Sequence, residues 1–149
     1  MHRKPFMEGN NIEILLVEDN IDDAQLAIRA LKKNNLANNL LHLQDGQDAL
    51  DYLLSEQSSP YLKVILLDLK MPKVDGIEVL RRLKSHEFLK VIPVVMLTSS
   101  KEEQDVVETY KLGVNAYIVK PVEFEKFVKA IADVGMFWLI LNERPRIGK

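Results

Sequence analysis

The sequence predicts an α/β protein in which five parallel strands form one sheet with helices on both of its faces. Five short runs rich in aliphatic residues predict the strands, and segments with apolar residues every three or four positions separate them and predict helices. Strict alternation of this kind is typical of parallel sheets, because each parallel connection has to cross a face of the sheet. The strand runs are 12–17, 40–43, 64–67, 92–97 and 116–119.

The segments that follow these runs carry apolar residues at helical spacing, so that one side of each predicted helix can pack on the sheet. Asp22 and Asp23 come where the first helix should begin, and acidic residues there favour the positive end of the helix dipole. Gly113 follows the fourth helix, where glycine is common. The apolar positions are Ala24, Ala27, Ile28 and Leu31; Ala49, Leu50, Leu53 and Leu54; Ile77, Val79, Leu80 and Leu83; Val106, Val107 and Tyr110; and Phe124, Phe127, Val128 and Ile131.

The composition excludes several classes of protein. The 149 residues include no cysteine, which rules out disulfides, thiolate zinc sites and thiol catalysis and fits a cytoplasmic location. The net charge of −2 gives no basis for sequence-independent binding of nucleic acid. No apolar run approaches the roughly 18 residues of a membrane span, so we expect no membrane association. We expect a flexible lead-in over 1–11, one domain over 12–134, and the end of the last helix with a tail over 135–149.

Polar side chains follow four of the predicted strands at the point where each strand ends. Glu18 and Asp19 follow the first strand, Asp68 the third, Thr98 the fourth and Lys120 the fifth. In an open parallel sheet, binding sites form beyond the carboxyl ends of the strands, where the strand order reverses. We therefore expect these side chains to converge on one rim, where the buried third strand holds Asp68 rigidly.

Three carboxylates on one rim repel one another unless a cation lies between them. A few oxygen ligands with room for water favour Mg²⁺, or Mn²⁺, over Ca²⁺. A calcium loop that starts at Asp19 is excluded, since its sixth position is Ala24 instead of glycine and its twelfth is Ala30 instead of glutamate. Lys120 adds positive charge to the same rim, and two cations beside a carboxylate nucleophile suit the transfer of a phosphoryl group.

Four stretches of the sequence resemble the motifs of a known family. They are ILLVEDN (14–20), LLDLKMPKVDG (66–76), VVMLTSS (94–100) and AYIVKP (116–121), in the order and at the spacing of the receiver domains of bacterial two-component response regulators. The resemblance covers roughly residues 12–134. It implies the flavodoxin-like (βα)5 fold, a doubly wound parallel sheet with the strand order 2-1-3-4-5.

The resemblance also implies a role for the acidic residues. Asp68 would accept a phosphoryl group from the histidine of a histidine kinase, and the metal ion would be held by Glu18, Asp19, Asp68 and the backbone carbonyl of Lys70. Two positions depart from the commonest family pattern. Glu18 stands where aspartate is more frequent, and Lys70 stands where asparagine is frequent.

Three further residues match positions of the family that act on the phosphoryl group or report its presence. The Thr98 hydroxyl would bond a phosphoryl oxygen, and the Lys120 ammonium would neutralise its charge. The bond between Lys120 and Pro121 would be cis. Tyr117 matches the aromatic residue that turns inward as the threonine moves, so Thr98 and Tyr117 form the predicted switch.

The end of the chain carries apolar residues that a lone receiver domain has nothing left to cover. If the last helix continues, Phe137 and Ile140 point away from the stripe that packs on the sheet, and Met136 lies to one side. An exposed patch of this kind indicates an interface. We therefore expect a homodimer through Met136, Phe137, Trp138 and Ile140, and a tail that folds back on itself is the alternative.

The function expected from these features is a signalling switch, with self-phosphorylation and slow autodephosphorylation but no substrate turnover. The chain ends at Lys149, so the receiver's own contacts would carry the output, and the tail is similar to single-domain regulators of phytochrome-type histidine kinases. One alternative is a phosphohydrolase of the haloacid dehalogenase type, which needs a second aspartate where this chain has Lys70. Another is a receiver that no longer accepts phosphate and acts as a binding module.

Overall fold

The computed structural model describes residues 11–33, 39–56, 58–71, 73–99 and 110–133. Five strands form one sheet in the order β2-β1-β3-β4-β5, and every neighbouring pair is parallel. The predicted fold class and strand order are therefore confirmed. The strands are β1 (Ile14–Val17), β2 (Leu40–Leu43), β3 (Val64–Asp68), β4 (Val94–Thr98) and β5 (Ala116–Val119).

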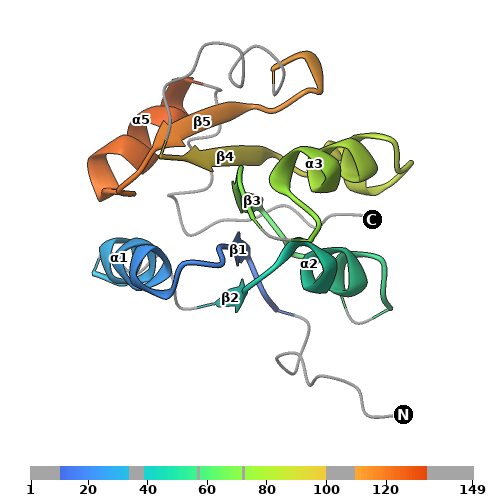
Figure 1. Cartoon of the computed structure of the whole chain (residues 1–149), viewed down its shortest axis with the longest axis horizontal. Coiled ribbons are helices and arrows are strands. Elements are labelled where there is room, and N and C mark those ends of the chain that lie inside the picture. Colours follow the sequence, from blue (N-terminus) through green and yellow to red (C-terminus); the bar gives the residue numbers. More distant parts are fainter. Residues whose placement is uncertain (1–10, 34–38, 57, 72, 100–109, 134–149) are drawn as a thin grey trace.

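Helices cover both faces of the sheet, with α1 and α5 on one face and α2 and α3 on the other (Figure 1). The described helices are α1 (Ile21–Lys32), α2 (Gly46–Leu53), α3 (Gly76–Lys84), the short 3-10 helix η2 (Leu89–Val91) and α5 (Phe124–Asp133). None of the helices in the described ranges is both long and apolar enough to cross a membrane.

Three predicted segments fall largely outside the described residues. The fourth predicted helix is described only at its end, where Gly113 has a φ of +96° and its N–H donates to the Tyr110 carbonyl at 3.1 Å. This left-handed conformation agrees with a glycine that ends a helix. The tail (135–149) and all but the last residue of the lead-in (1–11) also lie outside the described ranges.

The three central strands, β1, β3 and β4, are buried on both faces because their side chains alternate between two cores. In β3, Ile65 and Leu67 pack in the core beneath α2 and α3, whereas Val64 and Leu66 pack in the core beneath α1 and α5. All five residues of β3, including its terminal Asp68, are buried. A strand held on both faces gives its last residue a fixed position.

Three of the described helices, α1, α2 and α3, begin with a side-chain N-cap. Asn20, Asp45 and Asp75 each accept a hydrogen bond from the backbone N–H three residues later, at 2.9, 2.8 and 3.0 Å. Each cap of this kind stabilises a helix by about 1 kcal/mol. Asp22 and Asp23 lie in the first turn of α1 as predicted, although the capping residue itself is Asn20.

The sheet extends one residue beyond two of the predicted runs. β3 ends at Asp68 and β4 ends at Thr98, and both residues are paired with the neighbouring strand. β4 begins at Val94 instead of at residue 92. η2 ends at Val91 with Ile92 as its C-cap, and Pro93 has no N–H to donate to a strand ladder. Asp68 and Thr98 are therefore parts of the sheet itself.

Candidate functional site

The acidic pair after β1 consists of one buried and one exposed carboxylate. The backbone of Glu18 is held by β2, since its N–H donates to the Leu43 carbonyl at 3.0 Å and its carbonyl lies 2.8 Å from Nε2 of His42. The Glu18 side chain is buried, and its Oε2 accepts from the Asn20 N–H at 3.1 Å. Asp19 is exposed. Glu18 is therefore fixed, whereas Asp19 faces the open edge.

Asp68 is held at the end of β3 by the turn that follows it. The Leu69 N–H donates to the Leu97 carbonyl at 2.8 Å, and the Gly76 N–H donates to the Leu69 carbonyl at 2.9 Å. The start of α3 thus packs directly on the backbone of Asp68. The Asp68 side chain is only 4% exposed. A carboxylate this deeply buried needs compensating charge nearby.

Three carboxylates meet at this edge of the sheet. Ligand oxygens of Glu18, Asp19 and Asp68 all lie within 4.8 Å of one another. Hard oxygen donors in this number fit Mg²⁺ or Mn²⁺ better than softer metals. Lys70 is exposed and lines the same cavity, whose volume is about 240 Å³. The donor set therefore fits the predicted metal ion.

Lys120 reaches these carboxylates from the end of β5. Its Nζ lies 2.9 Å from Glu18 Oε1, 2.9 Å from Asp23 Oδ2 and 3.3 Å from Asp68 Oδ1. The backbone is anchored as well, since the Lys120 N–H donates to the Thr98 carbonyl at 2.7 Å and the bond to Pro121 is cis. Burial alone would lower the pKa of Lys120, but hydrogen bonds and charge from these carboxylates raise it, so the ammonium stays protonated.

The same crowding has the opposite effect on Asp68. Its pKa is raised from 3.8 to about 8, first by burial and then by hydrogen bonding and repulsion from Glu18 and a hydrogen bond with Asp19, against the attraction of Lys120. One ammonium does not offset several carboxylates. Ionisation of Asp68 near neutral pH therefore calls for additional positive charge in the site.

The two residues of the predicted switch lie on adjacent strands. Thr98 ends β4, is buried, and lines the cavity beside Asp68. Tyr117 lies on β5, is partly buried, and meets Tyr110 edge-on, with ring centroids 5.8 Å apart. Thr98 and Val119 are paired across β4 and β5, so the two predicted switch residues lie near the same end of the sheet.

Asp23 belongs to this site although it was not among the predicted site residues. Its position in the sequence indicated only the start of the first helix, but the Asp23 carboxylate also holds the Lys120 ammonium. One signal was available. Asp23 follows the predicted ligand Asp19 by only four residues, and both residues line the cavity at Asp68. The partner, 97 positions further along the chain, could not be identified from that spacing.

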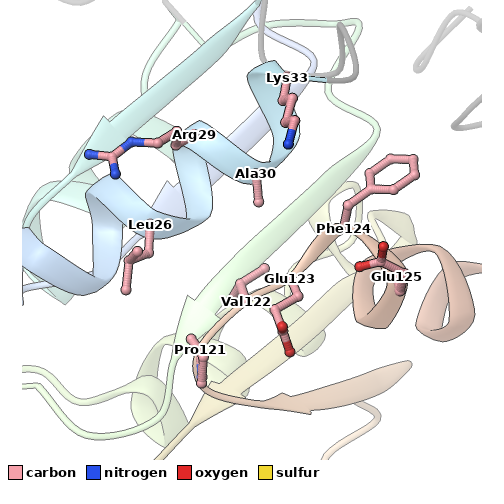
Figure 2. Close-up of a pocket in the computed structure, with 9 residues that line it drawn as sticks. All are labelled: Leu26, Arg29, Ala30, Lys33, Pro121, Val122, Glu123, Phe124 and Glu125. Carbon is pink, nitrogen blue, oxygen red and sulfur yellow. The ribbon is translucent and has the colours of Figure 1, made fainter.

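A second cavity, of about 560 Å³, lies between α1 and the segment that joins β5 to α5 (Figure 2). Leu26 and Ala30 of α1 face Pro121 and Val122 across it. Arg29 and Lys33 supply positive charge from α1, and Glu123 and Glu125 supply negative charge from the opposite side. We call this cavity the α1–α5 groove. It is larger than the cavity at Asp68 and lies next to it, since Pro121 directly follows Lys120.

The predicted dimer residues, Met136, Phe137, Trp138 and Ile140, lie outside the described residues.

Comparison with known proteins relates the chain to regulators of this architecture. A model of the response regulator receiver domain matches residues 14–132. The probable methanogenesis regulatory protein FilR2 of Methanothrix harundinacea is 42% identical over 134 residues, which are 89% of this chain and 86% of FilR2. The response regulator Rcp1 of Synechocystis sp. is 41% identical over 129 residues, which are 85% of this chain and 88% of Rcp1.

Solved structures of response regulators are also similar to this chain. The structure of the bacteriophytochrome response regulator AtBRR superposes with a TM-score of 0.75 at 55% identity, over 89% of this chain and 98% of AtBRR. The Mn(2+)-bound form of Rcp1 superposes with a TM-score of 0.70 at 40% identity, over 90% of this chain and 99% of that chain. With its parallel sheet and its rim of carboxylates, this chain belongs to the response regulator receiver domain family of two-component signalling.

Proposed function

We propose that Asp68 accepts a phosphoryl group from the histidine of a histidine kinase and that the protein signals through this modification. The observation that carries the proposal is the convergence of Glu18, Asp19, Asp68 and Lys120 at one edge of a receiver-type sheet. Each of these groups has a use in phosphoryl transfer to a carboxylate. The protein would then be a phosphoacceptor and not an enzyme that turns over a substrate.

In the proposed reaction, an oxygen of Asp68 attacks the phosphorus. A P–O bond forms, the P–N bond to the kinase histidine breaks, and the imidazole nitrogen keeps the electron pair. Lys120, whose Nζ lies 3.3 Å from Asp68 Oδ1, would neutralise a phosphoryl oxygen. The Thr98 hydroxyl, at the buried end of β4, would donate to another.

A divalent cation, Mg²⁺ or Mn²⁺, belongs to this proposal. Glu18, Asp19 and Asp68 would hold it, together with the backbone carbonyl of Lys70. When bound, such an ion offsets the charge of the carboxylates and of the phosphoryl oxygens. The Mn(2+)-bound form of the related Rcp1 supports this choice of ion.

Incubation with Mg²⁺ and acetyl phosphate, followed by intact-mass measurement, tests the proposal. We expect a gain of one phosphoryl group that is absent in Asp68→Asn. Asp51→Asn is the matched control, because it makes the same change at an exposed position of α2. Steady release of phosphate without a stable adduct would indicate a phosphohydrolase, and absence of any gain would indicate a binding module.

We further propose that a helix of the kinase docks in the α1–α5 groove. The groove opens beside Lys120, and its apolar floor between rims of opposite charge suits an amphipathic helix with charges of both signs. Leu26, which is 45% exposed, gives such a helix an apolar contact. AtBRR and RtBRR are bacteriophytochrome response regulators, which favours a phytochrome-type kinase as the partner of this chain. We propose a cytoplasmic location together with this partner.

Leu26→Glu tests the docking proposal. It should slow phosphotransfer from a phosphorylated phytochrome-type kinase by roughly tenfold, a loss of about 1.4 kcal/mol, and leave modification by acetyl phosphate unchanged. Leu54→Glu is the matched control, since Leu54 is 49% exposed and follows α2 on the other face of the sheet. Equal slowing by both variants would count against docking in this groove.

We also propose that phosphorylation moves Thr98 and Tyr117 together and that Met136, Phe137, Trp138 and Ile140 form a homodimer interface. Tyr117 meets Tyr110 edge-on, so rotation of Tyr117 on phosphorylation would break this contact between the two rings.

Sedimentation of the wild type, Phe137→Ala and Trp138→Ala, with and without acetyl phosphate, tests the proposed homodimer. A dimer that survives both substitutions would contradict it.

A further inference from the structure

The ammonium of Lys120 lies among three carboxylates that differ in their relation to the metal site. It has three protons to donate, and oxygens of Glu18, Asp23 and Asp68 lie 2.9, 2.9 and 3.3 Å away. Glu18 and Asp68 belong to the carboxylate cluster that fits a cation, together with Asp19. Asp23 contacts Lys120 but comes from the first turn of α1. Asp23 lines the same cavity but lies outside that carboxylate cluster, and at this site its carboxylate pairs with Lys120.

We propose that Asp23 is a positioning residue that holds the Lys120 ammonium and offsets its charge, so that Glu18 and Asp68 remain available to the divalent cation. This inference rests on the function proposed above. Lys120 and the cation attract the same two carboxylates, so an ammonium without Asp23 would draw closer to Glu18 and Asp68 and compete with the cation. A contact at the edge of the site would thus tune metal affinity without adding a ligand.

The surroundings of Asp23 support a fixed position. Its backbone N–H donates to the Asn20 side chain at 2.9 Å, which locks the first turn of α1. Ala24 and Ala27 anchor the same helix, since both are buried against the sheet. The Asp23 carboxylate is about one third exposed, so its pairing with Lys120 belongs to the modest range of partly exposed ion pairs.

Asp22 provides a matched control. It is exposed, lies in the same first turn of α1 and carries the same charge. Asp22→Asn and Asp23→Asn therefore change net charge and the helix-end interaction equally, but only the second alters the contact with Lys120. We expect Asp23→Asn to raise the Mg²⁺ dissociation constant roughly two- to fivefold, and Asp22→Asn to leave it within error of the wild type, both measured by calorimetric titration.

A double-mutant cycle isolates the route through Lys120. In a Lys120→Met background, Asp23→Asn should no longer weaken Mg²⁺ binding more than Asp22→Asn does, because the competing ammonium is gone. Urea unfolding of each variant shows that the change in affinity is separate from any change in stability. Persistence of the Asp23→Asn effect in the Lys120→Met background would overturn the inference, since Asp23 would then act on the cation directly.

Failure of the inference can be told apart from failure of the proposed function. A wild-type protein that binds no Mg²⁺ and gains no phosphoryl group would overturn the proposed function and this inference with it. A wild-type protein that does both, with Asp23→Asn equal to Asp22→Asn in Mg²⁺ affinity, would overturn the inference alone.

Discussion

Gly76 packs against the backbone of Asp68 so closely that a methyl group on Gly76 would overlap the Asp68 carbonyl oxygen. The glycine is buried at the start of α3, and its N–H bonds to the carbonyl of Leu69 at 2.9 Å. Any side chain at residue 76 would therefore displace the backbone of Asp68, the candidate phosphoacceptor.

We expect Gly76→Ala to lower the free energy of unfolding by about 1–3 kcal/mol through overpacking and to reduce modification of Asp68 by acetyl phosphate. Gly113→Ala is the control. Gly113 has a φ of +96°, but an added methyl group meets only the Lys84 side chain at ordinary distance. That variant should lose about 1 kcal/mol through backbone strain and keep its modification rate. Equal modification rates in both variants would contradict the role given to Gly76.

The raised pKa of Asp68 predicts that the metal-free protein loses stability as pH rises. The pKa is 3.8 for an unperturbed aspartate and about 8 in the folded protein, so between these values the folded state binds a proton that the unfolded chain lacks. The free energy of unfolding should then fall with pH across this window, by at most about 1.4 kcal/mol per pH unit from this group.

Urea unfolding at several pH values in the presence of a chelator checks this prediction. Asp68→Asn has no proton to lose at this position, and its stability should depend less on pH. Millimolar Mg²⁺ should also flatten the profile of the wild type, because a bound cation favours the ionised carboxylate. A metal-free wild type that gains stability from pH 4 to pH 8, relative to Asp68→Asn, would show that the sign is wrong.

A buried ion pair at the opposite ends of the strands offers a test of stability alone. Lys63 Nζ lies 3.2 Å from Glu13 Oε1, and Glu13 Oε2 accepts from the Asn39 side chain at 3.1 Å. The Lys63 side chain is only 5% exposed. Glu13→Gln leaves a buried ammonium without this carboxylate, so we expect a loss of about 3 kcal/mol, near the lower end for broken buried pairs because Glu13 is partly exposed.

Adding Lys63→Met to Glu13→Gln should recover part of the lost stability, because an apolar side chain tolerates the buried position. Thermal unfolding of the two single variants and the double variant gives the interaction energy. Modification of Asp68 by acetyl phosphate should stay at the wild-type rate in folded samples of all three, since the pair precedes β1 and β3 and the site follows them. A double variant less stable than both single variants would contradict the explanation that the buried Lys63 ammonium causes the loss of stability in Glu13→Gln.

Periodicity in the sequence determined the sheet and its helices. The central strand β3 is apolar on both faces because helices cover it on both sides. The helices are apolar on one face because only that face packs on the sheet. The residues that follow the strands could also be predicted as neighbours, because the carboxyl ends of parallel strands share one edge. Glu18, Asp68, Thr98 and Lys120 needed no further information to be placed there.

The sharing of charge within that edge depends on tertiary packing and could not be predicted. Tertiary packing buried Glu18 and exposed Asp19, and it paired Lys120 with Asp23 as well as with Glu18 and Asp68. It also formed the α1–α5 groove. The physical reason is that local periodicity specifies which face of an element is buried, whereas a contact between side chains 97 residues apart depends on how α1 and the end of β5 pack together on the sheet.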